Sequence, residues 1–204
     1  MRMDSQKSTP NVGEVKAPSR ARGHARVAAL LEAASAEFAE KGYDATTMTA
    51  IAARAKSSIG SLYQFFPTKD KVAGALMEQY VTELEAAFEA LRQQVGTPQL
   101  AERLTTLFVT FRATHPAFVV LAETPAVLAV GGSGVRERMR SGVASILTAI
   151  APQLPEQEAV LRATVVQHLM KAAVALSYDA SVSEPKAAML ELQRIVRAYL
   201  EELA

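Results

Sequence analysis

Apolar residues recur at helical spacing along most of the chain, beginning near residue 23. In the first stripe they follow one another at i, i+3, i+4, i+7 and i+11, as Val27, Leu30, Leu31, Ala34 and Phe38. This spacing places side chains on one face of an α-helix. Lys41 and Gly42 then supply a cation for the last turn and a glycine beyond it, a common helix end. The pattern predicts a helix over about 23–41.

Two short helices are predicted next, on either side of a tight turn. Thr46 or Thr47 can cap the first, and its apolar face is formed by Met48, Ile51, Ala52 and Ala55. Lys56 and Ser57 occupy the turn. Ser58 can cap the second helix, which ends at Pro67. We expect the inner face of this second helix to hold Leu62, Phe65 and Phe66.

A long helix then begins at Thr68 and continues its apolar stripe to Gly96, which would make it about 40 Å long at about 1.5 Å per residue. Further helical patterns cover about 99–114, 117–129, 135–151, 155–179 and 185–203, and no strand pattern is present. The predicted fold class is therefore all-α. We expect a disordered basic arm over 1–22, an N-terminal three-helix helix-turn-helix domain over 23–83, with the helix-turn-helix itself at about 46–65, and a C-terminal helical domain over 84–204.

Composition narrows the class of protein. The 204 residues are 50% hydrophobic and include no cysteine and no tryptophan, so disulfides and thiolate metal sites are excluded. The longest apolar runs are too short to span a bilayer, and the first ten residues lack the apolar core of a signal peptide. We expect a cytoplasmic protein with no membrane partner.

Charge is distributed unevenly, although the formal net charge is only +1. Residues 1–71 contain 11 Lys or Arg against 7 Asp or Glu, whereas residues 72–204 contain 11 against 14. The basic N-terminal part is the candidate for contact with a polyanion.

The two short helices and their turn have the arrangement that places a recognition helix in the DNA major groove. Gly60 and Ser61 would let the backbone approach the duplex, Gln64 can bond to base edges, Ile59 can touch thymine methyls, and Tyr63 can reach a phosphate. Lys69 and Thr47, near the starts of the neighbouring helices, are expected to contact phosphates. The predicted DNA-binding residues are Thr47, Lys56, Ser57, Ser58, Ile59, Gly60, Ser61, Tyr63, Gln64 and Lys69.

The segment ATTMTAIAARAKSSIGSLYQFFPTKDKV, residues 45–72, resembles the DNA-binding domain of the tetracycline-repressor-like (TetR, or AcrR-type) family of transcriptional regulators. The preceding AALLEAASAEFAEKGYDATTM resembles the first helix of the same family and its entry into the second, so the resemblance covers about 23–83. It implies a homodimer with one helix-turn-helix per subunit, and a C-terminal body that binds a small effector and usually relieves repression. The expected partner is double-stranded DNA carrying a pseudo-palindromic operator.

The turn departs from the family pattern. Where the family usually has Ala-Gly-Val-Ser, this chain has Ala55-Lys56-Ser57-Ser58. If Lys56 keeps the left-handed conformation of the glycine, it loses on the order of 1 kcal/mol, and Ser57 removes an apolar contact from under the turn. Lys56 also adds a positive charge beside the recognition helix, which either contacts a phosphate or remains solvated.

In the C-terminal body, apolar side chains that could line an effector cavity are Phe108, Phe111, Phe118, Leu121, Leu128, Met139, Ile146, Met170 and Leu176. Any one of them could instead be ordinary core. We expect ligand contacts from Phe108, Phe111, Phe118, Leu121, Met139 and Met170, and a small hydrophobic effector.

The last two helices are expected to form the homodimer as a four-helix bundle. On the first of them the residues expected to allow close approach are Ala159, Ala163, Val166, Met170, Ala173 and Val174. On the second the expected stripe is Met189, Leu192, Ile195, Val196, Tyr199 and Leu200.

Two other functions stay open. One is a helical ligand-binding protein or enzyme with a vestigial helix-turn-helix, although no Ser/His/Asp cluster, cysteine nucleophile or paired catalytic carboxylates stand out, so that no catalytic residue is assigned. The other is a sequence-independent DNA binder. His115 and His168 lack ligand-spaced partners, and we expect no metal and no cofactor.

Overall fold

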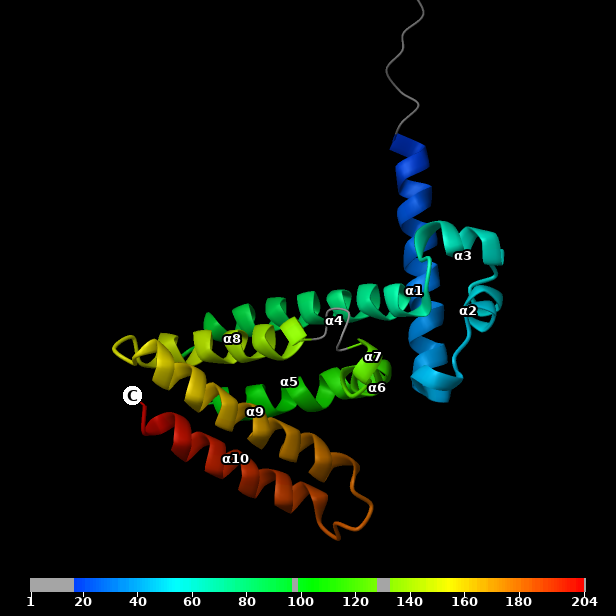
Figure 1. The fold of residues 1–204 in the computed structure, drawn as a ribbon. Helices are drawn as coiled ribbons and strands as arrows, with labels where there is room; N and C mark the ends of the chain where they lie inside the picture. The colour runs from blue at the N-terminus through cyan, green and yellow to red at the C-terminus, as the bar shows by residue number, and fades with distance from the viewer. Residues whose placement is uncertain (1–16, 97–98, 128–132, 204) are drawn as a thin grey trace, which may run out of the picture.

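The computed structural model describes residues 17–96, 99–127 and 133–203, and within these ranges every regular element is an α-helix (Figure 1). The all-α prediction is confirmed. The helices are α1 (Ala17–Ala45), α2 (Met48–Arg54), α3 (Ile59–Phe65), α4 (Lys69–Arg92), α5 (Leu100–Thr114), α6 (Pro116–Ala122), α7 (Pro125–Val127), α8 (Ser133–Ile150), α9 (Glu156–Tyr178) and α10 (Pro185–Glu201).

The N-terminal boundary was predicted too late in the chain. Helix α1 begins at Ala17, so 17–22 of the predicted disordered arm are helical, and 1–16 lie outside the described residues. Pro18 is compatible with this start because the first turn of a helix needs no amide donor there. The predicted end is supported, because Gly42 leaves the helical region at φ 78° and ψ 170°.

The predicted helix over 117–129 is divided. Helix α6 ends at Ala122 and the single turn α7 starts at Pro125, while 128–129 lie outside the described residues. A proline inside a helix removes an amide donor and clashes with the preceding turn, which accounts for the break.

Three of the predicted helix caps are confirmed. The hydroxyl oxygens of Thr47, Ser58 and Thr68 accept hydrogen bonds from the backbone amides that begin α2, α3 and α4. Each bond satisfies an amide with no partner inside its helix. The caps fix where the three helices start, and so set the length of the turn between α2 and α3.

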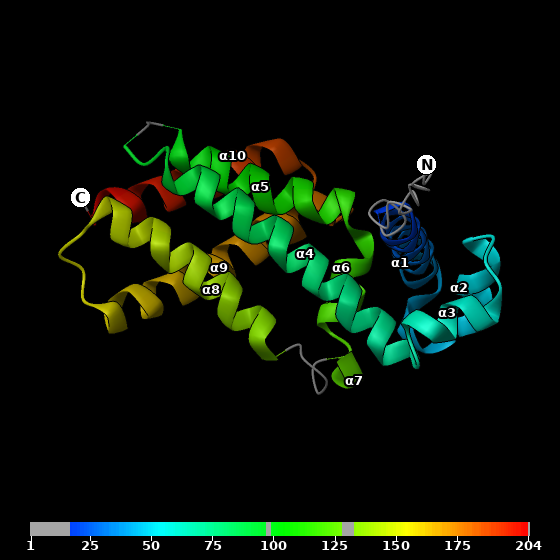
Figure 2. The same cartoon turned by 90° about the horizontal axis from the view of Figure 1, so that it is seen from above.

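Helix α4 leaves the three-helix unit and runs through the C-terminal body, where α8 packs along it (Figure 2). The contact is close, because a Cβ atom on Gly142 of α8 would lie 2.2 Å from the Phe88 ring. One turn before Gly142 on α8, Arg138 donates to Glu78 at 2.7 Å and to Glu85 at 2.6 Å. Helix α4 is thus held to α8 between Glu78 and Phe88.

Helix α6 packs against α1, so the N-terminal unit of α1, α2 and α3 meets the C-terminal body at a second place besides α4 (Figure 1). Nearby, the Tyr80 hydroxyl on α4 and the Ser35 hydroxyl on α1 lie 2.7 Å apart in a hydrogen bond. Burial raises the pKa of Tyr80, which keeps the phenol protonated.

Helices α9 and α10 lie side by side at the far edge of the body (Figure 1). The residues expected to approach a second copy are largely used within the chain, because Ala159, Ala163, Val166, Met170 and Ala173 are buried, as are Leu192, Val196 and Leu200. Exposed apolar side chains on these helices form a different set, Val160, Leu161, Val165, Tyr178, Leu190 and Ile195. Of the expected stripe only Ile195 belongs to it.

By length and composition alone α9 would be sufficient to span a bilayer. In this fold, however, it packs against α5, α8 and α10. Core helices of soluble bundles have the same composition, so this feature is weak evidence for a membrane span.

Candidate nucleic-acid interface and ligand cavity

The turn between α2 and α3 is closed by two backbone hydrogen bonds. The amide of Ser57 donates to the Ala52 carbonyl at 2.9 Å and that of Lys56 to the Ala53 carbonyl at 3.0 Å. This pair defines a Schellman motif, in which glycine usually occupies the left-handed position. Here Lys56 occupies it at φ 51°, the one positive φ at a non-glycine residue in the described ranges. Lys56 therefore does keep the left-handed conformation that glycine usually adopts in this turn.

Ser57 takes the place where such a turn usually makes an apolar contact with the helix it ends. Its side chain is half-buried, and its hydroxyl oxygen accepts a long hydrogen bond of 3.4 Å from Arg26 on α1. A weak polar contact therefore replaces apolar packing under the turn.

Helix α3 has one buried face and one open face. Leu62 is fully buried and Phe66 is 8% exposed, while Gly60 and Gln64 lie on the opposite side and are exposed. No atom lies within 4 Å of where a Cβ of Gly60 would be, and its φ is not positive. Nothing inside the chain therefore requires glycine at this position.

The open face is flanked by apolar and aromatic side chains, with Ile59 40% and Tyr63 50% exposed. Ser61 is half-buried and donates its amide to the Ser58 cap at 3.2 Å. The structure thus brings the predicted residues of α3 together on one accessible surface.

The prediction that Phe65 belongs to the core is wrong, because its side chain is 39% exposed. Phe66 follows the helix in an extended conformation (φ −132°, ψ 97°) and is the buried phenylalanine. Phe65 consequently remains at the edge of the open face. Helical spacing alone gave no signal for this, since it assumed that α3 continues through residue 66.

Thr47 is exposed at the start of α2, and its hydroxyl oxygen accepts from the Ala50 amide at 3.1 Å. The hydroxyl hydrogen remains available to a phosphate oxygen. Helix α2 is itself held on α1 by Arg54, which donates to Glu37 at 2.8 Å and also contacts Glu40. A hydrogen bond from Lys41, together with Arg54, keeps the pKa of Glu37 below its usual range despite burial.

Lys69 is placed differently from the expectation. Its ammonium group donates to the carbonyl oxygens of Tyr43 at 2.8 Å, Thr46 at 3.0 Å and Asp44 at 3.2 Å. These three bonds use all three ammonium hydrogens. Lys69 thus ties the start of α4 to the segment that joins α1 and α2, and a direct phosphate contact would require it to leave these partners.

A cavity of about 830 Å³ lies among α4, α5, α6, α8 and α9. Five of the six predicted ligand contacts line it, namely Phe108, Phe111, Phe118, Met139 and Met170. Leu121 does not line it and is fully buried in the core. Ile146 and Leu176 do not line it either, and Leu128 lies outside the described residues. Sequence reasoning missed its polar lining, which includes Arg112, Arg136, Arg140 and Lys171.

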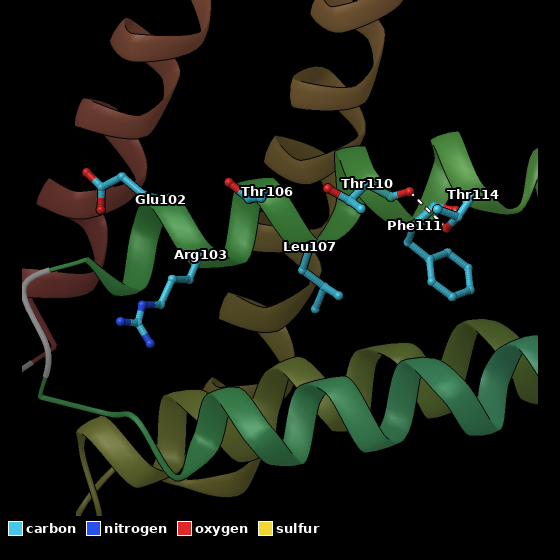
Figure 3. A pocket seen from close by; sticks show the side chains of 7 residues that line it. All are labelled: Glu102, Arg103, Thr106, Leu107, Thr110, Phe111 and Thr114. Carbon is cyan, nitrogen blue, oxygen red and sulfur yellow. Dashed lines mark hydrogen bonds between the residues drawn. The ribbon is translucent and has the colours of Figure 1, made fainter.

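A second hollow of about 460 Å³ is lined by α5 alone (Figure 3). In this view Leu107 and Phe111 point toward α4, and Thr106 points away from it. All seven lining residues belong to one helix, so the hollow is a surface depression. The cavity among the five helices is the stronger candidate for a ligand site.

Aromatic contacts connect the cavity with α1. Tyr80 lies edge-on to the rings of Phe111 and Phe118, with centroids 6.3 and 6.0 Å away, and both phenylalanines line the cavity. The Tyr80 hydroxyl is the group bonded to Ser35. A continuous set of contacts therefore runs from the cavity to α1, the first helix of the N-terminal unit.

Comparison with known families decides the identity of this architecture. Residues 30–76 match bacterial regulatory proteins of the tetR family, and residues 97–200 match the tetracyclin repressor-like C-terminal domain. The second match alone covers more than half of the chain. The chain belongs to the TetR family.

Curated relatives of this TetR-family chain match only part of it. An uncharacterized HTH-type transcriptional regulator of Bacillus subtilis, YhgD, is 27% identical over 62% of this chain and 66% of its own length. The HTH-type transcriptional repressor KstR2 of Mycobacterium tuberculosis is 37% identical over 48% of this chain and 49% of its own length. The chain thus spans less than two thirds of the length of these relatives.

Solved structures extend the likeness to the whole fold. A transcriptional regulator of Pseudomonas aeruginosa PAO1 superposes with a TM-score of 0.69 at 18% identity, covering 92% of this chain and 94% of that one. The fatty acid degradation regulator FadR of Bacillus halodurans gives a TM-score of 0.64 at 14% identity, covering 83% of this chain and 97% of that one. At these identities the likeness concerns the fold.

In this TetR-family turn, replacing Lys56 with glycine should raise the free energy of unfolding by about 1 kcal/mol, because glycine adopts φ near 50° without a Cβ clash. Urea unfolding of the full chain measures the change. Lys56→Ala is the matched control, since alanine retains the clash and should give no gain. Equal effects of the two substitutions would contradict the assignment of strain to this residue.

Proposed function

We propose that this TetR-family chain is a DNA-binding transcriptional repressor that a small ligand releases from a pseudo-palindromic operator. The observation that carries the proposal is the open face of α3. Gly60 has neither a neighbouring atom nor a positive φ to require it, and inside a helix glycine is about 1 kcal/mol less stable than alanine. Clearance for a DNA backbone or base edge gives this unfavourable residue a purpose.

The distribution of exposed apolar side chains supports both proposed partners. In the described part of the chain the large exposed apolar residues lie on three helices only: Ile59, Tyr63 and Phe65 on α3, Val160, Leu161, Val165 and Tyr178 on α9, and Leu190 and Ile195 on α10. Single exposed apolar residues are ordinary, but such gathering marks interaction surfaces. The α3 group suits DNA, and the α9 and α10 group suits a second copy of the chain.

In the proposed homodimer two α3 helices would enter successive major grooves, about 34–36 Å apart. Within each half-site Gln64 and Ile59 would contact base edges, while Tyr63, Thr47, Lys56 and the two serines of the turn would contact phosphates. Lys69 acts indirectly in this proposal, by fixing α4 against the segment before α2.

The proposed ligand response uses the contacts between the cavity and α1. A ligand against Phe111 and Phe118 would displace Tyr80 and α4, and would also move α6 against α1. For release, the ligand must bind the DNA-incompetent arrangement more tightly than the competent one. The protein would act in the cytoplasm, as a regulator rather than an enzyme.

Operator binding tests the function. Gly60→Ala should raise the free energy of unfolding by about 0.5–1 kcal/mol, because alanine is the better helix former, and yet weaken operator binding by about tenfold or more. Gln64→Ala should lower base discrimination within each half-site by about 1–3 kcal/mol.

For the measurement, full-length protein is titrated with the DNA beside its own gene and with random DNA over a salt series. Equal affinities for the two DNAs would favour sequence-independent binding, and no binding to either would favour the enzyme or carrier.

Disruption of the α9 and α10 surface tests the homodimer. The double substitution Leu161→Glu and Leu190→Glu places four carboxylates in the proposed interface of a dimer, so sedimentation should show a monomer. Thr106→Glu, on the exposed side of α5, is the control and should leave the dimer intact. A double variant that still sediments as a dimer would place the interface elsewhere.

Distances between labels test the ligand response. The chain has no cysteine, so Ala53→Cys on the exposed side of α2 gives one spin label per subunit. A compound selected by thermal shift should change the label separation in the dimer, whereas a label at Gln93→Cys, at the body end of α4, should move less. An unchanged separation at Ala53 with saturating compound would refute the proposed movement.

A further inference from the structure

The lining of the 830 Å³ cavity changes from apolar to cationic. Leu84, Phe111 and Met170 are buried at its apolar part. Four cationic side chains also line it, Arg112 on α5, Arg136 and Arg140 on α8, and Lys171 on α9, against one carboxylate, Glu123. A purely hydrophobic ligand, which the sequence suggested, would leave this charge unused.

The cationic side chains of the cavity have no carboxylate partner among the described residues. Outside the cavity, ion pairs with glutamates are formed by Arg54, Arg92, Arg138, Arg162, Arg194 and Arg197, whereas Arg26 and Arg103 bond to neutral side chains. None of the four cavity cations forms an ion pair, and Arg112 instead lies 4.8 Å from the centre of the Tyr178 ring. Four cations without a carboxylate partner in the described part of the chain thus line one cavity.

Arg140 gives the most specific signal. Its Nε atom is buried and has no hydrogen-bond partner in the described structure. A buried donor on a charged group is unfavourable without an acceptor, so native structures rarely leave one unmatched. On α8, Arg140 follows Arg136 by four residues, so the two arginines lie on the same side of the helix, and Met139 lies three residues after Arg136.

We propose that the effector is an amphipathic anion, whose apolar body occupies the region of Leu84, Phe111 and Met170 and whose carboxylate or phosphate group binds Arg140, with Arg136 and Lys171 adding positive charge. This inference rests on the proposed ligand-responsive function. A guanidinium group can donate two parallel hydrogen bonds to the two oxygens of a carboxylate or phosphate.

Calorimetric titration of the full, DNA-free chain with decanoate, decyl phosphate and decanol tests the class of ligand. The three probes share the same alkyl chain and differ in their head groups. At least one anion should bind at least about tenfold more tightly than decanol, because its head group makes charge-assisted hydrogen bonds. Preference for decanoate or for decyl phosphate identifies the head group. Equal affinity for decanol, or no binding of either anion, overturns the proposal.

Variants locate the head group. Arg140→Met should reduce the affinity for the preferred anion about tenfold and leave decanol unchanged. Lys171→Gln, at an exposed position, provides a second variant in case Arg140→Met does not fold. It should reduce the affinity for the anion by a smaller factor. Arg92→Met removes an arginine outside the cavity and should change neither affinity. Undiminished anion binding by both cavity variants would overturn the assignment.

Operator binding is measured separately, so the two proposals can fail independently. Anion-selective binding at Arg140 without any operator binding would reject the repressor function and leave the ligand class standing. Operator binding without discrimination between the anions and decanol would reject the ligand class and leave the repressor function standing.

Discussion

The position of the N-terminal helices relative to the C-terminal body depends on the burial of one apolar stripe along α4. Nine of its side chains, Val72, Ala73, Leu76, Met77, Tyr80, Val81, Leu84, Phe88 and Leu91, are buried along the contacts of α4 with α1 and the helices of the body. Each larger one contributes about 1.5–3 kcal/mol when removed from water, so together they outweigh the whole net stability of a typical domain. Helix α4 therefore cannot separate from either part while the protein stays folded, and a shift of this helix must be shared by both.

Two residues that precede α4 in the chain are unfavourable for the stability of their own local structure. Lys56 adopts a left-handed conformation without glycine, and Gly60 weakens a two-turn helix with no internal need for flexibility. Gly60 lies on the exposed face of α3, and Lys56 is exposed in the turn that precedes it. Residues that break local rules without an internal reason are often those that serve a partner, and the proposed DNA contact explains the glycine in this way. Lys56 has a positive charge on the same surface, and in that position it strains the turn.

The cavity is connected with the N-terminal unit of α1, α2 and α3 by a side chain of α4. Tyr80 packs on cavity phenylalanines through its ring and bonds Ser35 through its hydroxyl, so one side chain belongs to both parts. The cavity itself combines an apolar region with unpaired cations. In the proposed complex this lining would hold a charged head group at the edge and an alkyl or aromatic body inside. The ligand would then contact the phenylalanines that pack on Tyr80 of α4, the helix that follows α3.

The sequence by itself determined most of the helices, three of their caps and the turn, because these depend on residues within about four positions of one another. Thr47, Ser58 and Thr68 cap as expected, Lys56 is left-handed, and the TetR fold follows from the segment 45–72. Only the tertiary structure decided which face each helix presents, because that depends on segments remote in the chain. It exposed Phe65, buried Leu121, turned the expected dimer residues of α9 inward and gave Lys69 three carbonyl partners. It also brought four cations from three helices to one cavity, a convergence that no local spacing can encode.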